Sequence, residues 1–395
     1  MTEAGNTIGE YLASHGAPFY ELQLRIGLLR RDSLCVGRRA FIIVAICWGV
    51  PLVLSAIAGG AVGPADQDPF LLDMFAWARF FIAVSAFILS ERMTEDAHLE
   101  TLRQFQRALV IAPSSIEEAV RAVLTACRQR DSRIAEAVCL ALAILVSIAS
   151  YSNLKGVAGP SWAVEALPNG QSNLTLAAWW CLLISGPIFW FLLLRSLWRA
   201  VVWSELLRRL AGLELRLVST HPDGNGGIGF VGQVPNAYSL FVFGVSCLVG
   251  ASLAHHALHQ QLAATTVSSV MGGWLVIVFG LLAFPLTAFS KPLARLKKET
   301  LSATGAQATQ FHRASERKSL GRNIFAPDSG EGADQVDVAD PSKQFDTTRK
   351  LSVWLFNRSA LVPVAAAALL PIAAVGATQL PYKDLISIVK KLLLL

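Results

Sequence analysis

Residues 40–62 read AFIIVAICWGVPLVLSAIAGGAV, an apolar stretch that contains no charged side chain. An α-helix rises 1.5 Å per residue, so about 20 apolar residues are enough to cross roughly 30 Å of hydrocarbon. Five further stretches of similar length and apolar character follow, at residues 70–90, 134–152, 174–194, 237–257 and 264–289. The sequence therefore predicts an all-α, polytopic transmembrane helix bundle with six spans.

The composition is typical of a chain that is largely embedded in a membrane. Of its 395 residues, 53% are hydrophobic and 16% are charged, whereas an average soluble domain is about 25% charged. Six cysteines lie singly in or beside the apolar stretches without a CxxC pair, so we interpret them as packing residues. They are Cys35, Cys47, Cys127, Cys139, Cys181 and Cys247. We expect no cofactor.

Lysine and arginine are distributed unevenly between the loops, and this orients the chain. Four segments together carry 28 of these residues, whereas the three loops between them carry one, Lys155. The basic segments are 1–39, 91–133, 195–236 and 291–350, and the other loops lie around 63–69, 153–173 and 258–263. Positive residues remain on the cytoplasmic side of a membrane. We therefore predict a multi-pass protein of a bacterial inner membrane with a cytoplasmic N-terminus. Its expected partners are lipids and further copies of itself in a homo-oligomer rather than nucleic acid.

The segments between the spans include three larger cytoplasmic regions. Residues 91–133 are predicted to form a helical hairpin, in which a capping box at Ser115 and Glu118 starts the second helix. That helix has one apolar face, which requires a partner: another cytoplasmic helix, a neighbouring subunit or the membrane surface. Residues 195–236 are predicted to form a helix and a glycine-rich loop. Residues 290–350 are rich in polar residues and are predicted to be largely disordered.

The C-terminal part contains one more apolar block and an amphipathic helix. Residues 351–380 are interrupted by an arginine, two prolines and a glycine, and form either a seventh span or a re-entrant element packed against protein. Residues 381–395 are predicted to form an amphipathic helix whose lysines bind the anionic cytoplasmic leaflet, which places both flanks of the block inside. These lysines are Lys383, Lys390 and Lys391. The alternative for this helix is a contact between the subunits of a homo-oligomer.

Arg79 is the least expected residue of the chain because it lies near the middle of the second span. On insertion scales an arginine at this depth costs roughly 2.5–3.5 kcal/mol. Its helical face carries Ala76, Ala83 and Ala86, and small residues are typical of helix-packing or cavity-facing surfaces. Asp73 lies six residues nearer the outside and is expected on another face. Arg79 is therefore a candidate for an anion site or an aqueous pathway; the alternative is a structural arginine bound to the backbone carbonyls of a neighbouring helix.

Two histidines lie at the outer end of the fifth span. His255 and His259 are four residues apart and continue a stripe formed by Gly244 and Ala251, so all four share one face of the helix. Such a pair is able to ligate a transition metal or to titrate near pH 6.5. Because no third ligand accompanies them, interfacial histidines are the favoured interpretation, and we expect no metal.

The loop before the fifth span is unusually rich in glycine. Gly226, Gly227 and Gly229 indicate unusual backbone angles and expose amides that are able to cradle an anion. His221 and Asp223 in the same loop are candidates for an acid–base pair. The loop does not match a P-loop or a dinucleotide-binding motif. The favoured interpretation is a tight structural turn that leads into the fifth span.

The sequence of this loop resembles that of other proteins. The pattern HPDxxGGxGF from His221 to Phe230 resembles that of a group of uncharacterised bacterial polytopic inner-membrane proteins. The resemblance extends over the membrane region and the amphipathic C-terminal helix. It implies the bacterial inner membrane as the location, and it implies no activity.

Three function classes are compatible with these features. The leading hypothesis is a pore or transporter for a small ion or anionic solute, with Arg79 in the pathway. Its main rival is a membrane scaffold or signalling subunit that acts through its cytoplasmic and C-terminal helices. A membrane enzyme that uses the 221–230 loop on a phosphate-bearing substrate is the third, and the sequence favours a protein that is not an enzyme.

Overall fold

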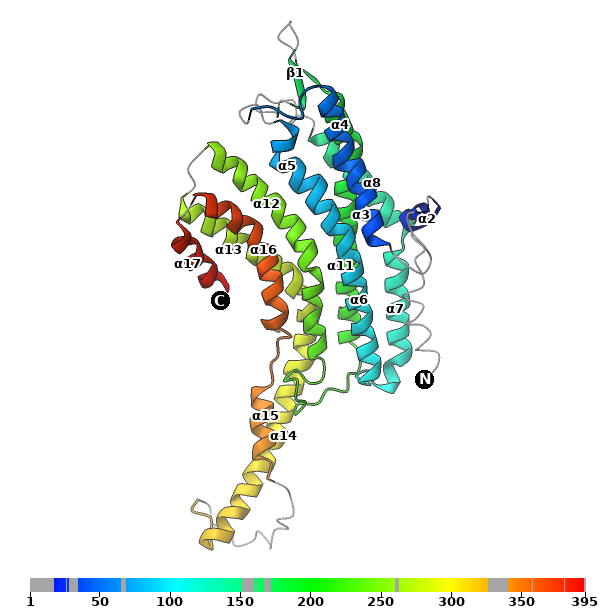
Figure 1. Ribbon diagram of the computed structural model, residues 1–395. Helices are drawn as coiled ribbons and strands as arrows, with labels where there is room; N and C mark the ends of the chain where they lie inside the picture. Colours follow the sequence, from blue (N-terminus) through cyan, green and yellow to red (C-terminus); the bar gives the residue numbers. More distant parts are fainter. Residues whose placement is uncertain are drawn as a thin grey trace.

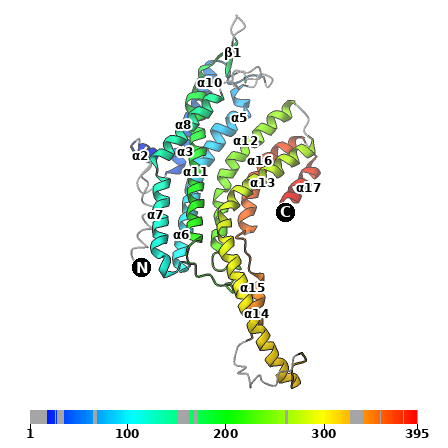
Figure 2. The same cartoon turned by 180° about the vertical axis from the view of Figure 1, so that it is seen from behind.

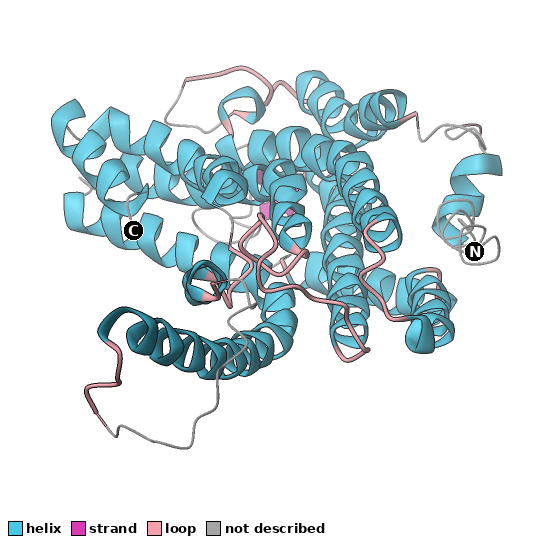
Figure 3. Ribbon diagram, turned by 90° about the horizontal axis from the view of Figure 1, so that it is seen from below, coloured by secondary structure: helices cyan, strands magenta, loops and turns pink. Residues whose placement is uncertain are grey.

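The computed structural model describes most of the chain. The described residues are 18–25, 27, 35–64, 69–150, 160, 162–166, 172–259, 263–325, 340–356, 358–379 and 381–393. They are almost entirely helical, and the strands among them form one short antiparallel pair (Figure 3). The strands are β1 (Val164–Ala166) and β2 (Ser172–Leu174), with Glu165 opposite Asn173.

Seven helical stretches of the described residues are long and apolar enough to cross a membrane, so the chain is a multi-pass membrane protein. They run over Val36–Ile57, Met74–Arg107, Pro113–Ala149, Leu176–Ala211, Gly229–Leu258, Ala264–Leu320 and Ser359–Gln379. The predicted all-α polytopic bundle is confirmed, and each of the six predicted spans falls in one of the first six stretches.

The individual elements follow one another in a simple order. The first part of the chain contains α2 (Pro18–Arg25), α3 (Val36–Val44), η1 (Ala45–Gly49), α4 (Val50–Ile57), η3 (Phe70–Leu72), α5 (Met74–Ala76), η4 (Trp77–Ala83), α6 (Val84–Arg107), η5 (Pro113–Ser115), α7 (Ile116–Arg130) and α8 (Arg133–Ala149). The second part contains α10 (Leu176–Trp180), η6 (Cys181–Ser185), α11 (Gly186–Ala211), η7 (Gly229–Tyr238), α12 (Ser239–His259), α13 (Ala264–Ala283), η8 (Phe284–Phe289), α14 (Ser290–Leu320), α15 (Ser342–Lys350), α16 (Arg358–Gln379) and α17 (Tyr382–Leu393).

The helices form two groups that lie side by side (Figures 1 and 2). The first group contains the helices from α3 to α11, and the second contains α12, α13, α16 and α17. Helix α12 joins the groups because it packs against η4 and α6 on one side and against α16 on the other. The end of the bundle that carries β1 and β2 is called the β end below, and the opposite end, from which α14 projects, is called the α14 end.

The helical hairpin expected within 91–133 is formed by the lower part of α6 and by α7 (Figure 1). The apolar face of α7 finds its partner within the chain, since Val123 and Cys127 belong to a buried cluster with Leu206 and Leu210 of α11. The predicted capping box is wrong: the Ser115 hydroxyl accepts the N–H of Glu214 and makes no cap hydrogen bond. The hydroxyl of Ser115 is therefore used in a contact with a distant residue, Glu214, instead of a cap on its own helix.

The prediction that residues 290–350 are largely disordered is wrong for the described part of this segment. Helix α14 continues the sixth span to Leu320, and α15 packs against it. The polar sequence is held by specific contacts: Arg295 and Glu299 pair at 2.8 Å one turn apart, and His312 Nε2 lies 3.0 Å from Ser342 Oγ. Charge pairs at this spacing stabilise helices that lack an apolar stripe.

Within the apolar block 351–380, residues Arg358–Gln379 form one continuous helix, α16, with Pro363 and Pro371 inside it, whereas residues 351–356 are not helical. The length and composition of α16 are those of a membrane span, which favours the seventh-span alternative over the re-entrant one. The two flanks of α16 lie toward opposite ends of the bundle (Figure 1), unlike the expectation that both lie on one side, and the leaflet that the lysines bind stays a prediction. The amphipathic α17 folds back against α13, with Ile388 and Leu392 on the α13–α16 cluster.

Candidate functional site

A cavity of about 460 Å³ surrounds Arg79 near the β end of the bundle. Arg79 lies in η4, a π-helical segment in the second span, and π-segments are frequent at functional sites. Two other spans carry π-segments, η1 and η6, which contact each other, and η1 also contacts η4. The polar lining consists of Asp73, Arg79, Ser147, Ser150 and His255. These side chains come from three different spans and their caps, so only the folded bundle brings them together.

The Arg79 guanidinium lies between aromatic rings. Its Cζ atom is 5.9 Å from the ring centre of Phe80 and 5.7 Å from that of Phe189, distances typical of cation–π contacts. Within the described part of the chain, Arg79 forms no ion pair, and its buried Nε atom has no hydrogen-bond partner. Among these residues, no backbone carbonyl of a neighbouring helix accepts a hydrogen bond from the guanidinium, so the contacts expected for a structural arginine are not seen. Arg79 therefore presents unused hydrogen-bond donors to the cavity.

Asp73 lines the same cavity, so the expectation that it points to another face is wrong. Its carboxylate accepts the N–H groups of Phe75 (2.8 Å) and Ala76 (3.1 Å) and caps the helix that contains Arg79. It also accepts the indole N–H of Trp162 at 2.9 Å. Asp73 and Arg79 therefore line one cavity without forming an ion pair, and the Asp73 carboxylate is engaged by these three bonds while its charge still attracts the guanidinium.

The helix-packing stripe on α12 is present in the structure. A Cβ atom at Gly244 would lie 2.8 Å from Ala86 Cβ, so α12 and α6 approach each other closely only because this residue is a glycine. The approach places His255 at the cavity, where its ring is 5.8 Å from that of Phe75. His259 is the last residue of α12. No group of three potential metal ligands occurs among the residues that the structure describes.

A layer of phenylalanines lies beneath Arg79 on its α14 side. Phe87 contacts Phe189 at a centroid distance of 5.8 Å and Phe241 at 5.1 Å. All three rings are buried. Phe189 also receives the Arg79 guanidinium, and Phe241 lines a second cavity on the other side. These three residues, called the Phe layer below, separate the two cavities.

A buried network of charges joins four helices just beyond this layer. Glu91 accepts from Arg39 at 2.9 Å and from Arg195 at 2.7 Å, and Arg195 also contacts Glu136 at 3.2 Å. The backbone N–H of Phe19 donates to the second Glu136 oxygen at 2.9 Å. These four charged residues, called the charge network below, clamp α3, α6, α8 and α11 together. A charge pair of this kind is stable in a low-dielectric site because every charge has a partner.

Sequence reasoning missed the charge network, although a signal was present. Arg39 directly precedes the predicted first span, Glu91 directly follows the second and Arg195 directly follows the fourth. Glu136 lies at the start of the third span. Charges at span ends are usually interpreted as solvated residues at the membrane surface. Four of them at the same end of four spans form a pattern that also permits mutual pairing.

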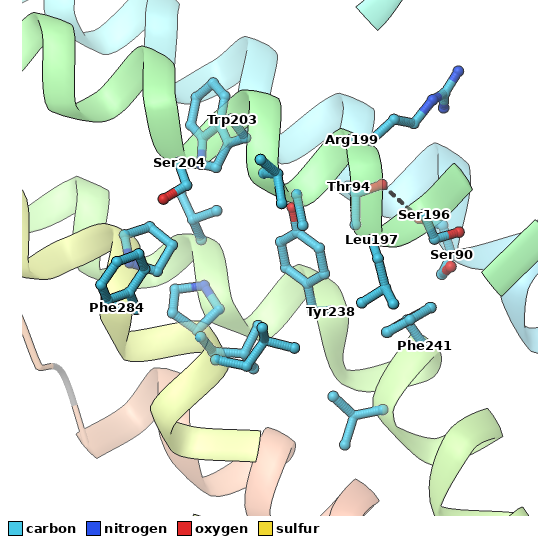
Figure 4. A pocket seen from close by; sticks show the side chains of 18 of the residues that line it. Ser90, Thr94, Ser196, Leu197, Arg199, Trp203, Ser204, Tyr238, Phe241 and Phe284 are labelled. Atoms are coloured by element: carbon cyan, nitrogen blue, oxygen red, sulfur yellow. Dashed lines mark hydrogen bonds between the residues drawn. The ribbon is translucent and has the colours of Figure 1, made fainter. Parts of the chain in front are cut away.

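The second cavity has a volume of about 580 Å³ and lies between α6, α11, α12, α13 and η8 (Figure 4). One wall is polar and includes Thr94, Glu95, Ser196 and Arg199. Arg199 pairs with Glu95 at 2.9 Å, so this wall is largely charge-compensated. The other wall is apolar and is formed by residues of α12, α13 and η8. The second cavity is therefore polar on one side and apolar on the other.

His98 and Tyr238 close one part of the polar wall. The His98 Nε2 atom lies 3.0 Å from the Tyr238 hydroxyl, and its ring stacks on Trp203 at a centroid distance of 3.9 Å. His98 is buried, while both residues line the second cavity. This contact joins α6 to the start of α12 across the boundary between the two helix groups.

In the glycine-rich loop, the carboxylate of Asp223 occupies the place that was predicted for a bound anion. The Asp223 carboxylate accepts the backbone N–H groups of Asn225 (2.9 Å), Gly227 (3.1 Å) and Gly229 (2.9 Å). Burial alone would raise the pKa of Asp223, but these bonds and the His221 ring together lower the pKa below its ordinary value. His221 Nδ1 lies 2.9 Å from Asp223 Oδ1, which agrees with the proposed pairing of the two residues. The amides of these three residues are thus occupied by Asp223.

The loop has a clear structural role. Gly224, Gly226 and Gly227 have φ values of +67°, +70° and +95°, which favour glycine. Asn225 donates to the carbonyls of Ser352 and Trp354 at 3.3 and 3.2 Å, so the loop binds the segment between α15 and α16. This arrangement agrees with the favoured interpretation of a tight turn.

Comparison with protein-family models, with curated proteins and with solved structures finds no match to this chain. The resemblance of the 221–230 loop to bacterial inner-membrane proteins stays a prediction.

Proposed function

We propose that the protein transports a small anionic solute across a bacterial inner membrane, with Arg79 as the anion-binding residue. The observation that carries the proposal is the Arg79 cavity, in which a guanidinium in the second turn of a membrane span has no ion-pair partner among the described residues. The span begins at Met74, so Arg79 lies nearer its β end than the middle position expected from the sequence. An arginine at this depth is costly, so it is usually paired or faces a water-filled cavity. An anion supplies the missing partner. The hydroxyls of Ser147 and Ser150 already donate to the carbonyls of Leu182 and Ser147, so the proposed binding of the anion depends on Arg79.

The orientation follows from the charge distribution. The α14 end carries the basic segments, so we place it and the N-terminus in the cytoplasm. The Arg79 cavity is then on the outer half of the bundle and the second cavity on the inner half, with the Phe layer as the barrier between them. In this conformation the barrier is closed, because its three rings are buried and in contact.

The direct test is anion flux into proteoliposomes, with chloride, nitrate, formate and phosphate as probes. Arg79→Gln is expected to abolish the flux and Arg79→Lys to retain part of it, since lysine keeps the charge but not the planar fork. Phe87→Leu is expected to accelerate the flux because it opens the Phe layer. Arg92→Gln is the matched control, since Arg92 lies on the same helix with an exposed side chain.

The stability of each variant is measured on the same preparation. Arg79→Gln is expected to unfold at the same temperature as the wild type or higher, because the substitution removes a buried charge without an ion-pair partner in the described structure. A stable Arg79→Gln variant with unchanged flux, or a wild-type protein that carries none of the four anions, contradicts the proposal. A large loss of stability supports the structural alternative for Arg79.

A scaffold or signalling subunit is the second candidate, and the α14–α15 pair favours it. This pair projects beyond the bundle (Figure 1). Near its far end Leu320, Ile324 and Phe325 are exposed, Phe325 at 85%. Exposed apolar residues of this kind suit a partner protein. Ile324→Ser with Phe325→Ser is expected to remove such a partner in a pull-down experiment and to leave anion flux unchanged.

Contacts in the structure also bear on the enzyme hypothesis and on the role of α17. A membrane enzyme acting through the 221–230 loop is less favoured, because Asp223 occupies the amides that a phosphate requires. Lys390 and Lys391 of α17 are exposed and available to lipid headgroups or to a second copy of the chain, whereas the side chain of Lys383 lies outside the described residues. With the α14 end inside, α16 carries α17 toward the outer half, so these lysines are proposed to face the outer leaflet rather than the cytoplasmic one.

A further inference from the structure

We propose that the second cavity binds an anionic phospholipid of the surrounding bilayer, with an acyl chain inside the cavity and the phosphate at Arg208. This site is separate from the Arg79 cavity, and the proposal does not rest on anion transport. It is carried by the shape of the cavity, by the residues at its opening and by the charge at one end.

The cavity is long enough for an acyl chain. It follows α11 from Leu193 to Arg208, and a helix rise of 1.5 Å per residue makes this about 22 Å. Its volume of about 580 Å³ lies in the range of small-molecule sites. In Figure 4 Ser204 and Phe284 lie at one end, whereas Ser90 and Phe241 lie at the other. An elongated cavity with one apolar wall accommodates a hydrocarbon chain.

The opening faces the bilayer. Ile277 and Leu281 of α13 line the cavity and are 60% and 51% exposed. Val201 of α11 and Phe284 of η8 also line it, and their exposed fractions are 58% and 57%. Apolar side chains that are exposed on membrane-spanning helices contact lipid chains. The rim is therefore covered by hydrocarbon in the membrane, and a lipid chain enters without crossing water.

The positive charge at one end selects the headgroup. Arg208 lies over the ring of Phe284 at 4.8 Å, with Nη2 3.3 Å from Ser204 Oγ. It shares the Glu205 carboxylate with Arg209, at 3.3 and 3.1 Å. Two guanidiniums with one carboxylate between them leave one positive charge in excess. A phosphate diester carries the complementary charge, and arginine binds phosphate through paired N–H groups.

The test uses a phosphatidylglycerol that carries a photoactivatable diazirine in its acyl chain. The full-length protein is placed in phosphatidylcholine nanodiscs with a small fraction of this probe, and cross-linked peptides are identified by mass spectrometry. Cross-links are expected within 197–204 and 274–282, and excess phosphatidylglycerol should suppress them more strongly than excess phosphatidylcholine. Lipid contacts on the exposed face of α8 serve as the reference for nonspecific labelling.

Adjacent residues provide matched variants. Ile277→Trp fills the cavity and is expected to abolish the specific cross-links, whereas Val276→Trp adds the same side chain to a residue that does not line the cavity. Arg208→Gln is expected to weaken competition by phosphatidylglycerol about tenfold, the effect of losing one charge-assisted hydrogen bond. Arg209→Gln removes the same excess charge at a residue that does not line the cavity, so it is expected to weaken the competition less than Arg208→Gln and separates direct contact from net charge.

Each result decides the proposal. Labelling of α11 and α13 at the level of the α8 reference, or labelling that survives Ile277→Trp, overturns the cavity site. Equal competition by phosphatidylcholine overturns the anionic headgroup and indicates a neutral lipid. Anion flux is measured separately, so an absence of flux overturns the transport proposal and leaves this one in place.

Discussion

Arg195 Nη1 lies 2.7 Å from Glu91 Oε1, although the two residues are 104 positions apart and each directly follows a predicted membrane span. Arg39, at the start of the first span, forms a second salt bridge with Glu91. Three spans are therefore joined by charge at their corresponding ends, and Glu136 adds the fourth. We therefore expect the charge network to contribute strongly to the free energy of unfolding by holding these helix ends together.

Glu91→Gln is expected to destabilise the protein by about 3–5 kcal/mol, because two buried guanidiniums lose their shared carboxylate. The loss is measured by thermal or denaturant unfolding in detergent. Arg92→Gln is the control, since the adjacent Arg92 forms an exposed pair with Asp96 and should change stability by no more than about 1 kcal/mol. Equal effects of the two substitutions would contradict a structural role for the charge network.

Asp223→Asn is expected to destabilise the protein by about 1–2 kcal/mol at neutral pH, because three backbone N–H groups lose a charged acceptor. The folded-state pKa of Asp223 lies below its ordinary value of 3.8. Its contribution to stability is therefore complete above about pH 5, decreases below the unfolded-state pKa, and is lost as the pH falls through the folded-state pKa. Stability is measured for both proteins between neutral and acid pH, and the difference between them should disappear at the acid end. A difference that is constant with pH argues against ionisation as its source.

Gly227→Ala is expected to lower stability by about 1–2 kcal/mol, since φ is +95° and a side chain at this angle is strained. Space is available there, because an added Cβ would lie 3.7 Å from the nearest His221 atom. The cost is therefore conformational rather than steric. Gly273→Ala in α13 is the matched control with the opposite sign: nothing lies within 4 Å of its Cβ, and alanine favours the helix by about 0.5–1 kcal/mol. The two changes are compared by thermal unfolding.

Single cysteines test the orientation. Asn173→Cys in β2 is expected to react with a membrane-impermeant thiol reagent in intact cells, and Gln310→Cys in α14 is expected to react only after the cells are opened. Both positions are exposed, and the unsubstituted protein corrects for the natural cysteines. Labelling in the reverse order would invert the assignment of both cavities.

The type of the membrane helices and the positions of six of them follow from sequence alone, whereas the seventh was left open between a span and a re-entrant element. Each predicted span consists of about 20 apolar residues, and the free energy of placing them in hydrocarbon depends on the residues themselves rather than on their neighbours. The same local argument identified Arg79 as exceptional. It also distinguished the 221–230 loop, because clustered glycines indicate backbone angles with positive φ, which glycine adopts most readily.

Tertiary structure decided which charged groups meet. Arg39, Glu91 and Arg195 each resemble a solvated residue at a span end, and only the arrangement of four helices turns them into the charge network. The partner of Asp223 was likewise hidden, since it is the backbone of its own loop. Helix α14 is held by pairs within the helix and by α15, contacts that composition does not reveal. Burial in hydrocarbon is a property of a segment, whereas the pairing of charges depends on distances that exist only after the segments have packed.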